Sequence, residues 1–168
     1  AHPGWTRAYA YNEKSLLEGN KKNNRLTSTT VSDSDEIYSA DGDGYDAHGN
    51  MLHMPHLQEM RWDFQDRLLM TQRQKVNNDE EDGVQHNGER TWYVYDSSGQ
   101  RVRKVTDRAT VQGQESTRMN ERIYVGGFEI YRDYKNDGAS TTVERETLHI
   151  MDEKQRIALV ETKTAEAG

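Results

Sequence analysis

Two six-residue stretches of this chain share one pattern, in which Tyr-Asp is followed by two variable residues, Gly and then Asn or Gln. The first reads YDAHGN at 45–50, and the second reads YDSSGQ at 95–100. Each constant residue has a role in a turn: the Asp carboxylate accepts backbone N–H bonds, and glycine supplies a left-handed residue. The Tyr ends a strand and packs on its neighbour in the sheet. The pattern therefore favours one repeated structural unit over a metal-binding or catalytic loop.

A third stretch, at 62–68, has the related form aromatic-Asp-x-x-x-Arg, and the stretch that starts at Tyr95 gives a version one residue longer that ends at Arg101. The pair Gly126-Gly127 predicts a two-residue hairpin turn in which both residues can take positive φ. Recurring units of this kind indicate stacked hairpins that bury their faces only against their neighbours. The residues that we expect to form these repeated turns are Tyr45, Asp46, Gly49, Asn50, Trp62, Asp63, Arg67, Tyr95, Asp96, Gly99, Arg101, Gly126 and Gly127.

Between the turns, β-branched and aromatic residues fall in short runs that are typical of strands. The best helix candidate, at 13–22, is short and contains Gly19. The predicted fold class is therefore all-β, an antiparallel meander of hairpins. The strands that we expect lie at 7–11, 25–31, 36–39, 51–54, 59–64, 67–76, 89–95, 101–106, 119–125, 128–134, 141–151 and 155–162.

The composition limits which kind of sheet this meander can form and which partners it can bind. Only 32% of the residues are hydrophobic and 30% are charged, but nine Tyr and three Trp argue against a disordered chain. A sheet with one solvated face fits this balance. The net charge of −7 disfavours binding to nucleic acid or to anionic lipid. No apolar stretch approaches the length of a membrane span, so we expect no membrane insertion by this segment.

Two clusters resemble metal sites but fail the tests for them. The stretch 41–46 begins like a calcium loop, yet the EF-hand pattern requires Glu at its twelfth position, where this chain has Leu52. His48, His53 and His56 lie within nine residues, but on a strand a spacing of three places His53 and His56 on opposite faces. We therefore expect a polar turn and surface histidines, with no metal and no cofactor.

The sequence offers no catalytic motif. It has no cysteine, and it lacks the nucleophile elbow, the phosphate loop and the zinc-protease helix motif. Asp63, Asp66, Asp96 and Glu129 could pair as a general acid and base, but with 29 acidic residues some pair always lies close by. We expect a protein that is not an enzyme.

The aromatic residues leave a second function open. Trp62, Trp92 and Tyr93 could form a face that stacks on sugars, which would make the chain a carbohydrate-binding β module for cell surfaces. Cross-strand packing in a thin sheet is the reading that we favour for them.

The turn motifs at 45–50 and 95–101 resemble the YD repeats of bacterial Rhs proteins and of the C component of insecticidal toxin complexes. The stretches 121–132 and 145–162 resemble the toxin-complex branch in particular. The resemblance covers roughly 45–164. It implies a strip of a larger β-shell that spirals around a toxic C-terminal effector and carries no active site of its own. The self-cleaving aspartates of that family belong to a downstream core region that this chain does not reach.

The resemblance also implies an organisation and a set of partners. We expect a less certain leading hairpin or linker region at 1–40, a YD-repeat strip at 41–164 and a tail at 165–168. The expected partners are neighbouring repeats of a longer polypeptide, an enclosed effector and toxin-complex subunits. The parent protein would be assembled in the cytoplasm and then exported. Because the strip has open edges, we also expect it to self-associate.

Overall fold

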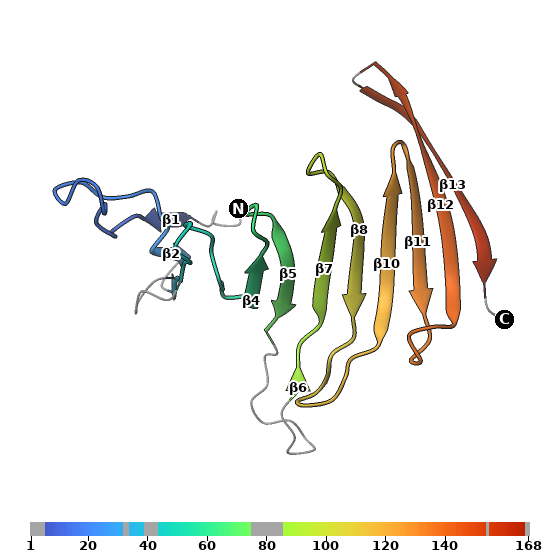
Figure 1. The fold of residues 1–168 in the computed structure, drawn as a ribbon, viewed down its shortest axis with the longest axis horizontal. Helices are drawn as coiled ribbons and strands as arrows, with labels where there is room; N and C mark the ends of the chain where they lie inside the picture. The colour runs from blue at the N-terminus through green and yellow to red at the C-terminus, as the bar shows by residue number, and fades with distance from the viewer. Residues whose placement is uncertain (1–5, 32–33, 39–43, 75–85, 154, 167–168) are drawn as a thin grey trace, which may run out of the picture.

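The computed structural model describes residues 6–31, 34–38, 44–74, 86–153 and 155–166, and within them the chain forms thirteen strands and no helix. Figure 1 shows the longer strands from β4 to β13 side by side in one row, with β1 and β2 set apart from them. The strands are β1 (Arg7–Ala10), β2 (Ser28–Val31), β3 (Ser34–Ile37), β4 (Leu57–Trp62), β5 (Leu68–Arg73), β6 (His86–Asn87), β7 (Arg90–Tyr95), β8 (Arg101–Asp107), β9 (Thr110–Val111), β10 (Arg118–Val125), β11 (Phe128–Tyr134), β12 (Thr141–Asp152) and β13 (Gln155–Glu166).

These strands form three antiparallel sheets. The largest has eight strands in the order β13-β12-β11-β10-β8-β7-β5-β4, so from β4 onward it follows the chain order and omits only the short pair β6–β9. The other two sheets are β1-β2-β3 and β6-β9. Strands that pair with their neighbours in sequence are joined by hairpins, and the predicted all-β hairpin meander is confirmed.

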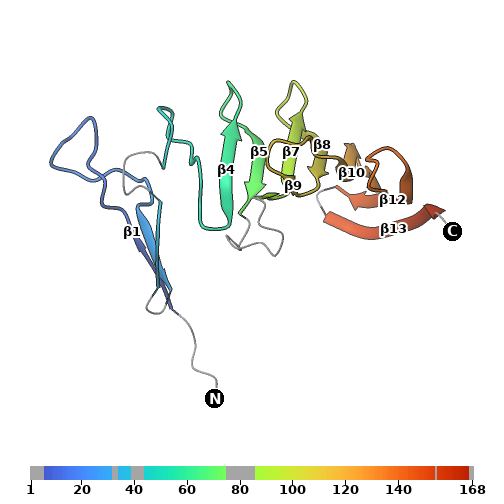
Figure 2. The ribbon, with the colours of Figure 1, turned by 90° about the horizontal axis from the view of Figure 1, so that it is seen from below.

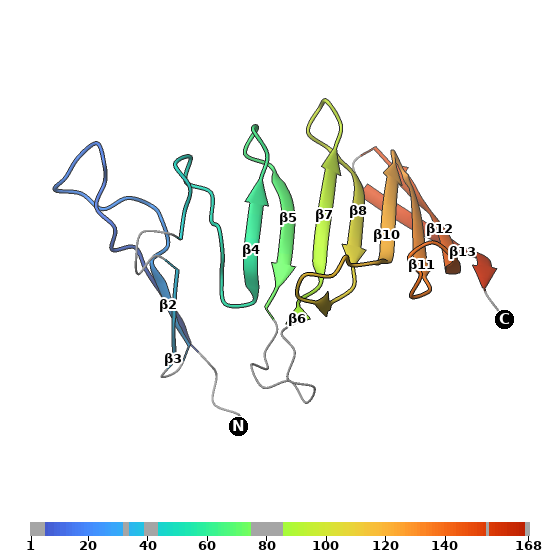
Figure 3. The same cartoon turned by 60° about the horizontal axis from the view of Figure 1, so that its bottom comes forward.

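The large sheet is a single twisted layer. Figures 2 and 3 show β4 and β5 running across the direction that β12 and β13 take at the other end. This change is the accumulated right-handed twist of neighbouring strands. Among the described residues, the buried hydrophobic side chains are Tyr38, Met70 and Tyr134, and of these only Met70 is fully buried. The sheet therefore has no thick hydrophobic core, and each strand is stabilised mainly by contacts with the neighbouring strands.

The stretch at 13–22, which was the best helix candidate, forms no helix. This stretch is an irregular loop whose ends meet at an isolated bridge between Lys14 and Lys22. The Ser15 hydroxyl accepts the backbone N–H groups of Leu17 and Glu18 at 3.2 Å, which forms a local turn. Its two leucines are adjacent rather than three or four residues apart, so a helix here would have no apolar face to bury.

The predicted strand at 51–54 is wrong. It makes only isolated bridges, from Met51 to Tyr45 and from Met54 to Leu57, and Pro55 follows directly. Proline has no N–H to donate to the hydrogen-bond ladder of a sheet, so regular strand pairing begins after it, at β4. The turn at Gly126 and Gly127 does join β10 to β11, although Gly126 alone of the two has a positive φ, of 59°.

Gly88 stands where two backbones approach closely, between β6 and β7. A Cβ atom at this position would lie 1.9 Å from the carbonyl oxygen of Arg73 in β5. The same site carries the bond from the Arg73 N–H to the Glu89 carbonyl, at 2.9 Å. The absence of a side chain at Gly88 is therefore a condition for β5 and β7 to pair.

We predict that Gly88→Ala lowers the free energy of unfolding by about 1–3 kcal/mol, because the methyl group forces the paired backbones apart. Thermal unfolding followed by circular dichroism measures the effect. Gly19→Ala is the matched control, since a Cβ atom there meets nothing within 4 Å. Equal melting temperatures for the two variants would contradict the prediction.

Candidate functional site

The three aromatic-Asp stretches form the same turn. In each, one carboxylate oxygen of the Asp accepts the backbone N–H groups of the residues two and four positions later, at 2.8–3.0 Å. The residue three positions after the Asp has a positive φ in all three: Gly49 at 94°, Asp66 at 59° and Gly99 at 82°. Asp66 thus takes the glycine position, which an Asp side chain tolerates.

This geometry corrects the alignment of the motif. The turn that starts at Trp62 has the same length as the others, because the Asp63 N–H bonds the Arg67 carbonyl just as the Asp96 N–H bonds that of Gln100. Arg67 therefore corresponds to Gln100, and not to Arg101 as the sequence comparison suggested. The missing glycine at position 66 concealed the match.

The aromatic residue of each turn is bonded to the chain just after the preceding turn. The Trp62 indole N–H donates to the Met51 carbonyl at 2.7 Å, and the Tyr95 hydroxyl donates to the Leu68 carbonyl at 2.9 Å. Met51 and Leu68 each follow directly on the preceding turn. The Tyr45 hydroxyl makes the equivalent bond to the carbonyl of Leu26, at 2.7 Å. We call these three links the turn ladder.

Arginines reinforce two of the three links. Arg67 lies 5.0 Å from the centre of the Tyr95 ring and donates to the Asp96 carbonyl at 3.2 Å. Arg25 repeats this arrangement with the Tyr45 ring at 5.5 Å and the Asp46 carbonyl at 3.4 Å. Such cation–π contacts add to the hydrogen bonds between neighbouring units. The sequence analysis missed Arg25, although both arginines stand directly before the residue whose carbonyl the next tyrosine bonds.

The other predicted turn residues lie on or near the ladder. The Asn50 amide bridges two turns, because its nitrogen lies 3.0 Å from the Asp46 carboxylate and 2.8 Å from that of Asp66. Arg101 stacks on Tyr93 and on Tyr124, at 5.7 and 5.2 Å from the ring centres, and so extends the pattern toward β10.

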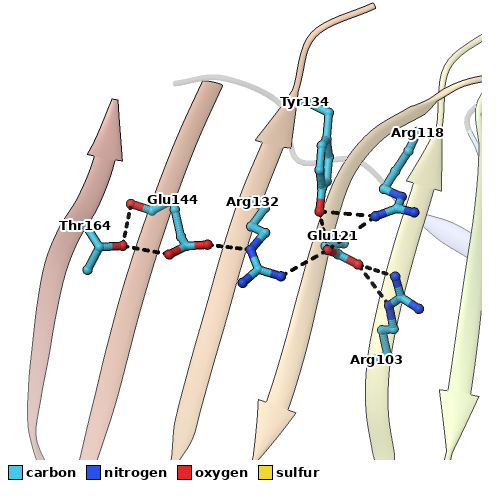
Figure 4. A network of polar contacts seen from close by, with 7 residues as sticks. All are labelled: Arg103, Arg118, Glu121, Arg132, Tyr134, Glu144 and Thr164. Atoms are coloured by element: carbon cyan, nitrogen blue, oxygen red, sulfur yellow. Dashed lines mark hydrogen bonds and ion pairs between the residues drawn. The ribbon is translucent and has the colours of Figure 1, made fainter. Parts of the chain in front are cut away.

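A buried carboxylate organises the sheet beyond the ladder. Glu121 in β10 is 2% exposed, and Arg103 of β8 donates to it from two nitrogens, at 2.5 and 2.9 Å. Arg118 and Arg132 each lie 3.5 Å from its other oxygen, which the Tyr134 hydroxyl also bonds. Figure 4 shows these groups converging on Glu121 from three strands.

The Glu121 network continues to the edge of the sheet. Arg132 bonds Glu144 of β12 at 2.5 Å, and the Thr164 hydroxyl of β13 bonds Glu144 at 3.1 Å. Burial alone would raise the pKa of Glu121, but the Tyr134 hydroxyl and Arg103 hold it below its ordinary value. This carboxylate is therefore ionised and fully engaged, which suits a clamp across five strands and does not suit a proton donor.

The three predicted sugar-binding residues do not form one platform. Trp92 and Tyr93 are consecutive in β7, so their side chains project to opposite faces of the sheet. Trp92 donates to Asp107 at 2.9 Å. Trp62 instead lines an open hollow of about 790 Å³ together with Leu52, Met60, Phe64 and Leu69, which we call the Trp62 groove.

The histidines show no convergence on a metal. His48 is exposed and pairs with Asp66, with 2.7 Å between its Nδ1 and the carboxylate, and this bond raises the pKa of His48. In the part of the chain that the structure describes, no group of three or more His, Asp or Glu is placed to hold a metal ion. The calcium-like stretch at 41–43 lies outside the described residues. Within those residues, no helix has the length and apolar character to span a membrane.

Comparison with known proteins shows a likeness among solved structures. No family model and no curated protein matches the chain. Among solved structures, the architecture is that of a segment within a much larger protein. That structure is the crystal structure of TcdB2-TccC3-TEV, which matches with a TM-score of 0.58 and 16% identity over 98% of this chain and 8% of the other. At this identity, the match establishes a shared fold.

A fourth turn gives the clearest pH dependence. The Asp137 carboxylate accepts the Ser140 hydroxyl at 2.5 Å and the N–H groups of Ala139 and Ser140 at 2.9 Å. These bonds, that of the Ser140 hydroxyl first, lower the pKa of Asp137 from 3.8 to about 2. A carboxyl whose pKa is lower in the folded state stabilises the fold above its unfolded pKa, and the contribution is lost as the pH falls through the folded value.

We predict that Asp137→Asn lowers the melting temperature at pH 7 by about 2–4 °C. The difference should shrink as the pH falls toward 2, because Asp137 is then about half protonated. Calorimetry across this pH range tests the effect, with Asp152→Asn at the exposed β12–β13 turn as the charge-matched control. A difference between the natural chain and Asp137→Asn that stays constant from pH 7 to pH 2 would refute the linkage.

Proposed function

We propose that this chain is a structural segment of an Rhs/YD-repeat shell, which encloses a C-terminal toxin effector and helps to deliver it. The turn ladder is the observation that carries the proposal. It consists of three equivalent hydrogen bonds, each from the aromatic side chain of a turn to a backbone carbonyl earlier in the chain, and two of them join successive turns. A unit that bonds its neighbours in this way builds a wall by repetition.

The structural likeness supports the same reading. The match to TcdB2-TccC3-TEV extends over 98% of the chain, which itself spans 8% of that protein. The name TccC3 is that of a toxin-complex C component, the branch that the stretches 121–132 and 145–162 resemble. We therefore propose neighbouring repeats, an enclosed effector and toxin-complex subunits as partners, and export after assembly in the cytoplasm.

The proposed organisation keeps the division into a leading region, a strip at 41–164 and a short tail. The leading region forms its own sheet, β1-β2-β3, while the strip contains the whole of the large sheet except the end of β13. We propose a non-catalytic role, since Glu121 is engaged by arginines rather than placed for chemistry.

The shell proposal predicts where this segment lies in its parent protein. Expression of the complete reading frame followed by electron cryo-microscopy should show a hollow particle, with 45–164 in its wall and a C-terminal region inside. Limited proteolysis should spare that region in the particle and digest it after the shell is opened with denaturant. A parent in which this segment is a separate, solvent-exposed module would overturn the proposal.

A strip also predicts an adhesive edge. β13 borders the sheet with twelve residues, and Ile157, Leu159 and Val160 in it are 63%, 50% and 49% exposed. We predict that the isolated chain associates in a concentration-dependent manner, measured by light scattering, and that Leu159→Lys weakens this association by placing a charge on the edge. Val125→Lys, at another exposed position, is the control. An unchanged association constant for Leu159→Lys would exclude pairing through β13.

A carbohydrate-binding module remains the second candidate, and the Trp62 groove favours it. Aromatic rings and carboxylates line this hollow together, as sugar sites require, and Phe64 there is 86% exposed. A glycan array should then show binding that Phe64→Ala abolishes and Trp92→Ala does not. Phe64 is the better position to change than Trp62, whose indole supports the turn ladder. An array without a bound glycan would remove this candidate.

A further inference from the structure

The irregular loop at 13–22 has two exposed leucines. Leu16 and Leu17 are 90% and 95% exposed, the highest values among the large hydrophobic residues that the structure describes. Figures 1 and 3 show this loop projecting from the end of the strip, away from β4. An adjacent pair of exposed leucines at a projecting loop is a feature of contact surfaces rather than of solvated loops.

The backbone of this loop is held in place by hydrogen bonds. The Ser15 N–H bonds the Lys21 carbonyl at 2.9 Å, and the Lys21 N–H bonds the Glu18 carbonyl at 2.8 Å. A loop that is ordered before contact loses less conformational entropy on binding. We call Leu16 and Leu17, as presented by this loop, the leucine tip.

Lysines surround the leucine tip. The stretch 14–22 holds three lysines and one glutamate, in a protein whose net charge is −7. Glu18 is paired with Lys21 at 2.5 Å, which leaves the positive charge of Lys14 and Lys22 in excess. The tip therefore suits an apolar hollow with a negative rim.

The Trp62 groove has this chemistry. Its apolar residues are those named above, and the carboxylates of Asp46, Glu59, Asp63 and Asp66 line it too. Arg61 pairs with Glu59, Arg67 with Asp63 and His48 with Asp66, so much of this negative charge is balanced, but the lining keeps more carboxylates than cationic groups. The Phe64 side chain is 86% exposed, so its ring is accessible to an apolar side chain of another molecule.

We infer that the leucine tip of one copy of this chain docks in the Trp62 groove of a second copy. In this contact, the leucines of the tip meet the apolar side chains of the groove, and the lysines beside the tip meet the carboxylates of the groove. Tip and groove are different surfaces, so the contact is head-to-tail and each copy can engage two others. This contact is independent of the proposed shell function and is separate from pairing through the β13 edge.

The test measures association by sedimentation equilibrium in the Leu159→Lys background, which suppresses edge pairing. The tip variant is Leu16→Ser/Leu17→Ser, and the groove variant is Phe64→Ser. All three side chains are at least 86% exposed, so their loss leaves the fold unchanged. We expect each variant to weaken association about tenfold or more. Val125→Ser, which removes an apolar side chain 63% exposed elsewhere, should have no effect.

Mixing the two variants makes the test specific. The tip variant keeps its groove and the groove variant keeps its tip, so an equimolar mixture should recover one strong contact and stop at a mixed dimer. Association of either variant at the strength of the parent chain, or a mixture without mixed dimers, would overturn the inference. Tip-dependent binding to phosphatidylserine–phosphatidylcholine vesicles without self-association would overturn it too and assign the leucine tip to a membrane.

Discussion

The structure depends on one hydrogen bond that recurs between turns: an aromatic side chain donates to the carbonyl just after the preceding turn. Because only three hydrophobic residues are buried among those that the structure describes, this hydrogen bond contributes much of the order along the strip. The aromatic ring covers the backbone while its polar atom fixes the distance to the neighbouring unit. Each turn therefore fixes the position of the next turn, and the strip does not need a central hydrophobic core to be ordered.

In the C-terminal half, ion pairs between side chains link the neighbouring strands. Glu121 and its arginines bind β8, β10 and β11 on one face, and Arg132 passes the network to Glu144. Tyr131 is flanked by Arg122 and Arg145, at 4.8 and 4.7 Å from its ring centre. Because most of these charged groups pair with one another, a chain that is 30% charged can build a regular sheet.

Local signals and long-range register explain what the sequence could and could not reveal. The turns and the meander follow from Tyr-Asp-x-x-Gly and from strand-like runs, which act within a few residues. Glu121 could not be chosen among 29 acidic residues, because its partners meet it only through the pairing of β8, β10 and β11. The same holds for the Trp62 groove, which joins two turns. The leucine tip was hidden by a weak helical pattern, and Asp66 was hidden because it stands where glycine was expected.

The order of the strands sets how the strip responds to force. Every strand of the large sheet pairs with its immediate neighbours alone, and the hydrogen bonds between them point along the length of the strip. Tension applied along that length acts on all the ladders in series, so the weakest ladder separates first and the others stay paired. A strip of this kind therefore separates between two strands, while the hydrogen bonds on either side of the break are kept.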